Sequence, residues 1–194
     1  GSEMCIRDRH WYKMKNRNVE LINIARIDLL KGKTNVDLEE LAKILLDNYD
    51  NKFDQDIGFY YEDSICPPNK YVDAIVDEIK MDFYAATEEK IEPTTFWGHI
   101  HEKNMSTSLH NHDKAYVSAV VYVKIPEGSG DIMFFPQFNQ YNNAAYASKF
   151  KPEEGIYYIF PGYLNHAVTR NMSEEKRISL SFNFKKLWKL LLKF

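Results

Sequence analysis

Residues 155–184 read GIYYIFPGYLNHAVTRNMSEEKRISLSFNF. Two runs rich in β-branched and aromatic residues, 155–160 and 176–184, enclose a stretch that is rich in turn-forming and polar residues, and this pattern predicts two strands. His166 stands between the two runs, and ten residues separate it from Arg177. The pattern therefore predicts a β-rich region that carries one histidine and one arginine close to its strands.

The same pattern extends towards the N-terminus. Further β-rich runs at 94–100, 116–125 and 130–135 alternate with turn residues, and the sequence PEGSG at 126–130 predicts a tight connection. Many short strands with regular punctuation favour a sandwich or a barrel. The polar, Asn- and Gln-rich segment 136–152 is expected to be a loop, either a lid over an active site or a solvated connection.

The N-terminal half has a different character. An apolar run at 20–30 could form a first strand, with a turn at 31–33. Asp37 is a good N-cap for a helix over 37–49, in which apolar residues recur at helical spacing. A second helix is expected over 70–85, after the PPN sequence at 67–69. Both helices are expected to lie against a sheet.

Length and composition suit one domain. The chain has 194 residues, 44% of them hydrophobic, and a formal net charge of −3. This charge does not favour a nucleic-acid partner, and no apolar stretch approaches the roughly 20 residues of a membrane span. Two cysteines, Cys5 and Cys66, form no disulfide framework, so a reducing, cytoplasmic setting is expected.

The expected organisation has two parts. Residues 1–9 resemble a tag or a sequence artefact, and residues 10–194 form a single domain. Within that domain we expect a helical part at 10–93, a β-rich core at 94–184 and a basic C-terminal tail at 185–194. The tail is expected to form a terminal helix that packs on the domain.

Five of the six histidines lie between residues 99 and 166. His99 and His101 form one H-x-H pair, and His110 and His112 form another. Because a strand has a period of two, each pair places both rings on one face. Two imidazoles on one face, joined by His166 from a distant strand, can form a three-point site for iron, copper, nickel or zinc.

Arg177 and Ser179 form an R-x-S pattern on the last predicted strand. Residues two apart on a strand share a face. A guanidinium can bind a carboxylate through two parallel hydrogen bonds, and a serine hydroxyl adds a further donor. The pair is therefore a candidate carboxylate-binding site.

Three blocks of this sequence resemble the 2-oxoglutarate- and iron(II)-dependent oxygenase family that is common in marine bacteria and cyanophages. They are Trp97 with the LHNH sequence at 109–112, VSAVVYV at 117–123 leading into IMFF at 132–135, and FPGYLNHAV at 160–168 followed by RISLSFN at 177–183. The resemblance covers about residues 94–184, and the last block is its most specific part.

The resemblance implies a fold and a chemistry. The implied fold is mainly β, with N-terminal helices that buttress a double-stranded β-helix core of jelly-roll, cupin-like type. The implied enzyme uses Fe(II), 2-oxoglutarate and O2, and couples decarboxylation of 2-oxoglutarate to succinate with oxidation of a small-molecule or side-chain substrate. Iron would be held by His110, His112 and His166, and Arg177 with Ser179 would bind the distal carboxylate of 2-oxoglutarate.

The sequence departs from the family pattern at the metal site. Most of these oxygenases have H-x-D, whereas His112 stands here in the carboxylate position. Three arrangements are open: His110 and His112 both bind iron, one of them binds together with a carboxylate such as Asp113 or Asp131, or the site has two histidines and no carboxylate. His99 and His101 fall outside the family pattern and are expected to play a supporting or structural role.

Apolar residues of the predicted strands are further candidates for the wall of the barrel. Those named on this basis are Val121, Val123, Met133 and Phe135.

Two other functions fit parts of the pattern. One is a cupin-like metal-dependent dioxygenase or metal-binding protein that does not use 2-oxoglutarate, in which three histidine ligands are common. The other is a non-enzymatic β-sandwich that serves as a binding module. The first of these leaves Arg177 and Ser179 without a task.

Overall fold

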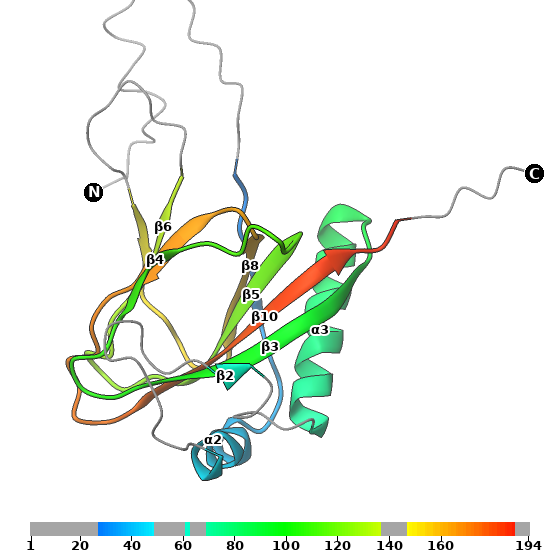
Figure 1. The fold of residues 1–194 in the computed structure, drawn as a ribbon. Helices are drawn as coiled ribbons and strands as arrows, with labels where there is room; N and C mark the ends of the chain where they lie inside the picture. The colour runs from blue at the N-terminus through cyan, green and yellow to red at the C-terminus, as the bar shows by residue number, and fades with distance from the viewer. Residues whose placement is uncertain (1–26, 49–60, 63–68, 137–146, 189–194) are drawn as a thin grey trace, which may run out of the picture.

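The computed structural model describes residues 27–48, 61–62, 69–136 and 147–188, and it contains two antiparallel β-sheets with two helices (Figure 1). The larger sheet has the strand order β1-β8-β5-β10-β3-β2, and the smaller has the order β4-β9-β6-β7. The strands of the larger sheet are β1 (Leu30–Lys33), β8 (Ile156–Pro161), β5 (Val117–Lys124), β10 (Arg177–Lys186), β3 (Ile91–His101) and β2 (Tyr61–Glu62). Those of the smaller are β4 (Thr107–His110), β9 (Asn165–Val168), β6 (Ile132–Phe135) and β7 (Ser148–Phe150).

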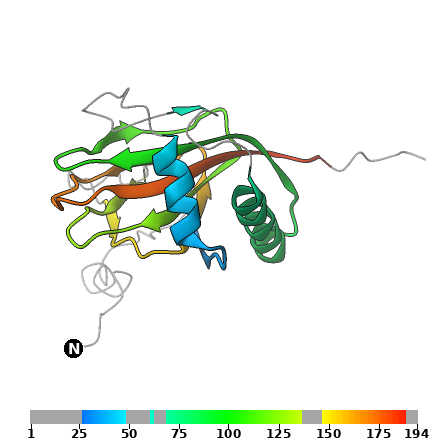
Figure 2. The ribbon, with the colours of Figure 1, turned by 90° about the horizontal axis from the view of Figure 1, so that it is seen from below.

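Two helices cover the outer face of the larger sheet, α2 (Leu38–Asp47) and α3 (Lys70–Thr87) (Figure 2). Asp37 caps α2, because its side chain accepts hydrogen bonds from the backbone N–H groups of the second and third helical residues. Asn69 caps α3 in the same way. Both helices therefore begin close to where the sequence predicts them.

The central strands β5 and β10 are buried on both faces, because one face meets the helices and the other meets the smaller sheet. On β10, Ile178, Leu180, Phe182 and Phe184 join the cluster that the helices cover. The alternate residues of β10 point the other way, and Arg177, Ser179 and Ser181 line a pocket between the sheets. Strand periodicity thus places every polar residue of the R-x-S pattern on the inner face.

The space between the sheets holds a second, smaller apolar cluster. Its buried members are Val120, Tyr122, Ile132, Phe134, Tyr158, Phe160 and Leu164. The prediction that Val121 and Val123 wall the barrel is wrong, because both face the helices. The neighbouring residues Val120 and Tyr122 take the inner positions, and on β6 Ile132 and Phe134 do so in place of Met133 and Phe135.

The predicted fold class, a mainly β core of jelly-roll type with helices at its outer face, is confirmed. The five β-rich runs predicted between 94 and 184 correspond to β3, β5, β6, β8 and β10. The prediction of a turn at 31–33 is wrong, because these residues pair with β8 as part of β1. A Cβ atom on Gly32 would lie 2.2 Å from the Tyr157 ring, so the glycine provides space for that ring and does not mark a turn.

Four short strands were not predicted: β2, β4, β9 and β7. The last lies inside the segment 136–152 that was expected to be a loop, of which residues 137–146 lie outside the described residues. Most of the first strand predicted at 20–30 also lies outside them, as do residues 1–9 and most of the C-terminal tail. Among the helices described, none is long and apolar enough to cross a membrane.

Candidate metal and carboxylate site

Three histidines converge between the two sheets. His110 ends β4 and His166 lies on β9, where the two residues are direct partners across the antiparallel pair. His112 follows β4 by two residues. One ring nitrogen from each of the three histidines lies within 4.8 Å of those of the other two. The structure therefore brings together the three histidines that the sequence nominated as metal ligands.

The other ring nitrogen is occupied in two of the three histidines. Nδ1 of His110 lies 2.8 Å from the carbonyl oxygen of Ser108, and Nδ1 of His166 lies 2.9 Å from that of Leu164. A carbonyl can only accept a hydrogen bond, so each Nδ1 carries a proton. This leaves Nε2 of both rings as the nitrogen that can bind a metal, which is the arrangement seen in metal-binding histidines.

His112 is positioned by the loop between β4 and β5. Its backbone N–H donates to the carbonyl of Gly162 at 2.7 Å, and its own carbonyl accepts from Ala115 N–H at 2.8 Å. A Cβ on Gly162 would lie 2.2 Å from the Ala115 carbonyl oxygen and 2.6 Å from that of His112. Only glycine fits so close to this backbone, which explains the glycine in the FPGYLNH sequence.

Burial keeps the metal-site histidines in the form that binds metal. Burial, together with the neighbouring His110, lowers the pKa of His166 to about 3 and that of His112 to about 4. Both rings are therefore neutral at pH 7. A neutral imidazole offers a lone pair to a metal, whereas an imidazolium cannot.

Arg177 and Ser179 line the same pocket as the three histidines. Arg177 is only 1% exposed and Ser179 only 2%. The guanidinium makes a long contact of 3.5 Å with the carbonyl of Ser129 and lies 5.5 Å from the centre of the Tyr122 ring. Among the described residues its Nε has no hydrogen-bond partner.

No carboxylate among the described residues forms an ion pair with Arg177. Asp131 is close enough to influence its pKa, but the carboxylate of Asp131 pairs with Lys149 at 2.7 Å. Burial lowers the pKa of Arg177 from its usual high value, because the charged form is desolvated. A buried guanidinium without a carboxylate partner is costly, and an anionic ligand would remove that cost.

The first H-x-H pair also faces the pocket. His101 and His99, on β3, are the direct partners of Arg177 and Ser179 on β10. Nε2 of His99 accepts a hydrogen bond of 2.7 Å from Trp97, and Nε2 of His101 lies 2.9 Å from the Thr107 hydroxyl. The rings stack with centroids 5.8 Å apart. The sequence predicted a supporting or structural role for these two histidines, and the structure places them along the wall of the pocket.

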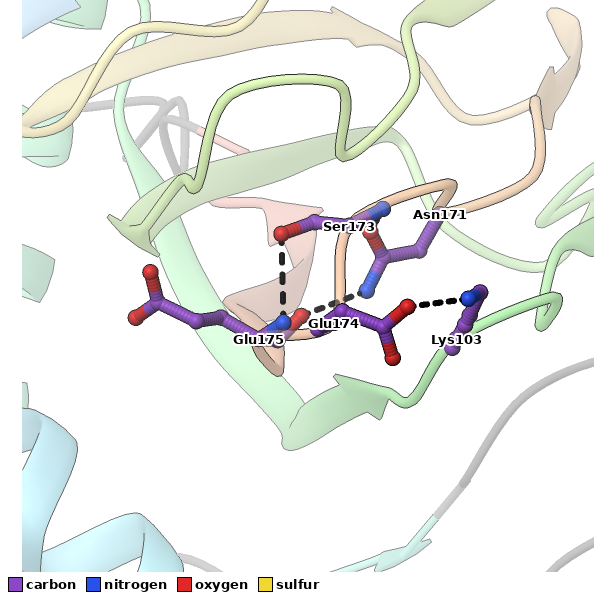
Figure 3. A network of polar contacts seen from close by, with 5 residues as sticks. All are labelled: Lys103, Asn171, Ser173, Glu174 and Glu175. Atoms are coloured by element: carbon purple, nitrogen blue, oxygen red, sulfur yellow. Dashed lines mark hydrogen bonds and ion pairs between the residues drawn. The ribbon is translucent and has the colours of Figure 1, made fainter.

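A network in the β9–β10 connection supports this part of the pocket (Figure 3). The buried Asn171 side chain donates to the carbonyls of His101 and Glu175 at 2.9 and 2.8 Å. Its side-chain oxygen accepts from Ser173 N–H, and Lys103 forms an ion pair with Glu174 in the same region (Figure 3). This network connects the end of β3 to the start of β10, where His101 and Arg177 lie side by side.

The two alternative carboxylate ligands do not join the histidines. Asp113 is exposed, and Asp131 pairs with Lys149. Within the described ranges, the group of residues that could hold a metal here contains His110, His112 and His166 and no carboxylate. The geometry thus favours the three-histidine arrangement over a site completed by either aspartate.

Comparison with known proteins agrees with this chemistry. Residues 95–183, just under half of the chain, match the family described as "Putative 2OG-Fe(II) oxygenase". The matched region runs from β3 to β10 and contains all of the candidate ligands. None of the curated proteins matches the chain in sequence. The family match agrees with the reaction class predicted from the sequence, that of a 2-oxoglutarate- and Fe(II)-dependent oxygenase, which uses O2.

Solved structures with the same fold are distant in sequence. The 2-oxoglutarate-dependent epimerase SnoN from nogalamycin biosynthesis has a TM-score of 0.64 at 12% identity, over 82% of this chain and 79% of that one. The viral collagen prolyl hydroxylase of Paramecium Bursaria Chlorella virus-1, solved with 2-oxoglutarate, has a TM-score of 0.58 at 15% identity, over 80% and 94%.

A third structure is longer than this chain. An oxidoreductase of the 2OG-Fe(II) oxygenase family from Burkholderia pseudomallei has a TM-score of 0.50 at 14% identity, over 60% of this chain. This chain spans 57% of that protein. At such identities the three structures show a shared fold, and their different activities do not select a substrate.

Proposed function

We propose that this protein holds Fe(II) through His110, His112 and His166, and binds the distal carboxylate of 2-oxoglutarate through Arg177 and Ser179, in order to hydroxylate a small molecule or a side chain. One observation carries the proposal. A single pocket is lined both by the three converging imidazoles and by a buried guanidinium that has no carboxylate partner among the described residues.

The three histidines fit an iron site of the catalytic kind. Imidazole suits iron, and three protein ligands leave other positions of an octahedral ion open for substrates. A purely structural zinc site normally closes with four protein ligands, and only three candidates meet among the residues described here. The carbonyls of Ser108 and Leu164 would orient two of the rings before the metal arrives.

The carboxylate site fits a dicarboxylic acid whose other end reaches the metal. Arg177 supplies a buried positive charge and Ser179 a hydroxyl on the same face of β10. Bound iron and 2-oxoglutarate would together supply the chemistry that activates O2. The protein's own residues would hold the cosubstrate in one orientation, and apolar side chains such as Val120, Ile132 and Phe160 would exclude water from the pocket.

For the substrate, we propose only a chemical class, a small molecule or a side chain. The viral collagen prolyl hydroxylase acts on a protein and SnoN belongs to a biosynthetic route, and this chain shares only the fold with both. A cytoplasmic location, an origin in marine bacteria or their phages, and the absence of nucleic-acid partners stay predictions from the sequence.

Anaerobic titration of the Fe(II)-loaded protein with 2-oxoglutarate tests this function. Chelation of the cosubstrate should produce a weak visible charge-transfer band, and His166→Ala should abolish it. Iron binding without the band would favour a cupin-like dioxygenase that does not use 2-oxoglutarate. Failure to bind iron at all would overturn the proposal and favour a non-enzymatic binding module.

A further inference from the structure

His101 lies beside Arg177 on the inner face of the larger sheet. The two residues are direct partners in the pairing of β3 with β10, and both line the pocket. Each is 1% exposed. The positive charge of Arg177 is close enough to lower the pKa of His101, after burial, which is the larger cause. His101 is therefore a neutral imidazole next to a buried cation.

The two nitrogens of the His101 ring are not equivalent. Nε2 lies 2.9 Å from the hydroxyl of Thr107, which is itself buried. Nδ1 is buried, and within the described part of the chain it has no hydrogen-bond partner. A buried polar atom left without a partner is costly, so a ligand that pairs with Nδ1 would gain by doing so.

The polar atoms around Arg177 share this condition. Nε of Arg177 and the hydroxyl of Tyr122 are also buried and without partners among the described residues. The three residues come from the neighbouring strands β3, β10 and β5, and their side chains meet on one face. The guanidinium Nε and the two unpaired groups beside it point to a ligand with several acceptor atoms, as a carboxylate has.

The ring of His101 is also held in place. It stacks on His99 with an angle of 19° between the ring planes, and Nε2 of His99 accepts from the indole N–H of Trp97. The carbonyl of His101 accepts from the side chain of Asn171. A ring fixed in this way loses little freedom when it binds a ligand, which favours a binding role over that of a passive filler.

We propose that His101, with its proton on Nδ1, is a cosubstrate-binding residue that donates a hydrogen bond to the carboxylate held by Arg177. In this arrangement the hydroxyl of Thr107 donates to Nε2, which accepts in the tautomer that carries its proton on Nδ1. This inference rests on the proposed use of 2-oxoglutarate, and it adds to Arg177 and Ser179 a residue from a different strand.

Calorimetric titration of the Mn(II)-loaded protein with 2-oxoglutarate tests the inference without turnover. His101→Leu should weaken binding about tenfold or more, the effect of losing a hydrogen bond to a charged group. His101→Asn should retain much of the affinity, because its amide N–H can occupy the position of Nδ1. Thr107→Val should weaken binding and Thr107→Ser should not, which tests the role of the hydroxyl.

A second ligand separates the carboxylate contact from general damage to the pocket. The acid 2-oxopentanoate has the same five-carbon chain and the same 2-oxo acid end but lacks the distal carboxylate. Its weaker binding should be unchanged in His101→Leu, measured by competition at millimolar concentrations. Equal loss for both ligands, or no loss for 2-oxoglutarate, would overturn the assignment of His101. Failure of the unmutated protein to bind 2-oxoglutarate would instead overturn the proposed function.

Discussion

The indole ring of Trp97 lies 5.3 Å from the imidazole ring of His112, measured between the ring centroids. The same indole donates its N–H to Nε2 of His99. One buried side chain therefore contacts a candidate iron ligand and also fixes a histidine on the wall of the cosubstrate pocket. Trp97 is only 2% exposed, so both contacts are shielded from water.

Replacing Trp97 by phenylalanine should separate these two tasks. An aromatic ring would still pack near His112, but Nε2 of His99 would lose its donor. We expect Trp97→Phe to lower the free energy of unfolding by about 1–3 kcal/mol, the cost of removing one partner of a buried hydrogen bond. Trp97→Ala should cost about 3–5 kcal/mol, because it also leaves a cavity. Urea unfolding of the metal-free protein would measure both values, and equal stabilities would contradict this role.

Arg177 should lower the stability of the ligand-free protein, although it is needed to bind 2-oxoglutarate. Its guanidinium is buried without a carboxylate partner among the described residues, so Arg177→Met should stabilise the ligand-free chain, by about 1–4 kcal/mol if the range seen for buried ion pairs replaced by apolar residues applies. The same variant, like Arg177→Ala, should lose most 2-oxoglutarate binding and keep metal binding. Thermal unfolding with and without 2-oxoglutarate would measure both effects.

Two results would contradict this role of Arg177. One is 2-oxoglutarate binding by Arg177→Ala that equals that of the unmutated protein. The other is a fall in stability of the ligand-free Arg177→Met variant. Arg177→Lys serves as the matched control, because it keeps the charge but cannot form two parallel hydrogen bonds with one carboxylate. We expect its affinity to lie between those of the unmutated protein and Arg177→Met.

The sequence predicted the parts of the fold that depend on periodicity. The R-x-S pattern placed Arg177 and Ser179 on one face of a strand, and the structure agrees because β10 pairs with β3 in unbroken register there, although its register with β5 shifts between Ile178 and Ser179. Both helices were predicted from the helical spacing of their apolar residues, and Asp37 was predicted as the cap of the first, whereas the cap at Asn69 is a finding of the structure. Such signals depend on residues close together in the sequence and not on contacts with distant segments.

Other features depend on contacts between distant segments, and the sequence pattern could not predict them. Val121 and Val120 are equally apolar neighbours, so nothing local indicates which of them faces the helices. Gly32 suggests a turn from the sequence alone, and only the structure shows that a glycine is needed there to leave space for the ring of Tyr157. His101 joins the pocket because β3 pairs with β10, which only the sheet order reveals. The sequence did hold one signal for His101, because its two-residue spacing from His99 places both rings on one face of the strand.

His166 should be essential for metal binding. It contributes one of only three nitrogens that converge among the described residues, so His166→Ala should reduce bound Fe(II) to near zero, measured by metal analysis after anaerobic loading and desalting. Asp131→Asn and Asp113→Asn should retain full metal content, because Asp131 pairs with Lys149 and Asp113 is exposed. Loss of iron in either aspartate variant would show that a carboxylate completes the site.

The buried histidines of β3 should make the metal-free protein sensitive to mild acid. Burial lowers the pKa of His101 to about 3 and lowers that of His99 as well, whereas in the unfolded chain both have pKa values near 6.5. Below pH 6.5 the unfolded chain therefore binds protons that the folded chain does not. Stability should fall as the pH falls through this window, by about 1 kcal/mol per pH unit for each such histidine.

The comparison of two variants isolates this effect from other titrating groups. His101→Asn removes one of the buried imidazoles but keeps a polar side chain, so its stability should depend less steeply on pH between 7 and 5 than that of the unmutated protein. Urea unfolding at several pH values, without metal, would give both slopes. Most carboxylates titrate below pH 5 and contribute little in this window. Identical slopes would mean that His101 is protonated in the folded protein, and would also remove the neutral ring on which its proposed contact with the cosubstrate depends.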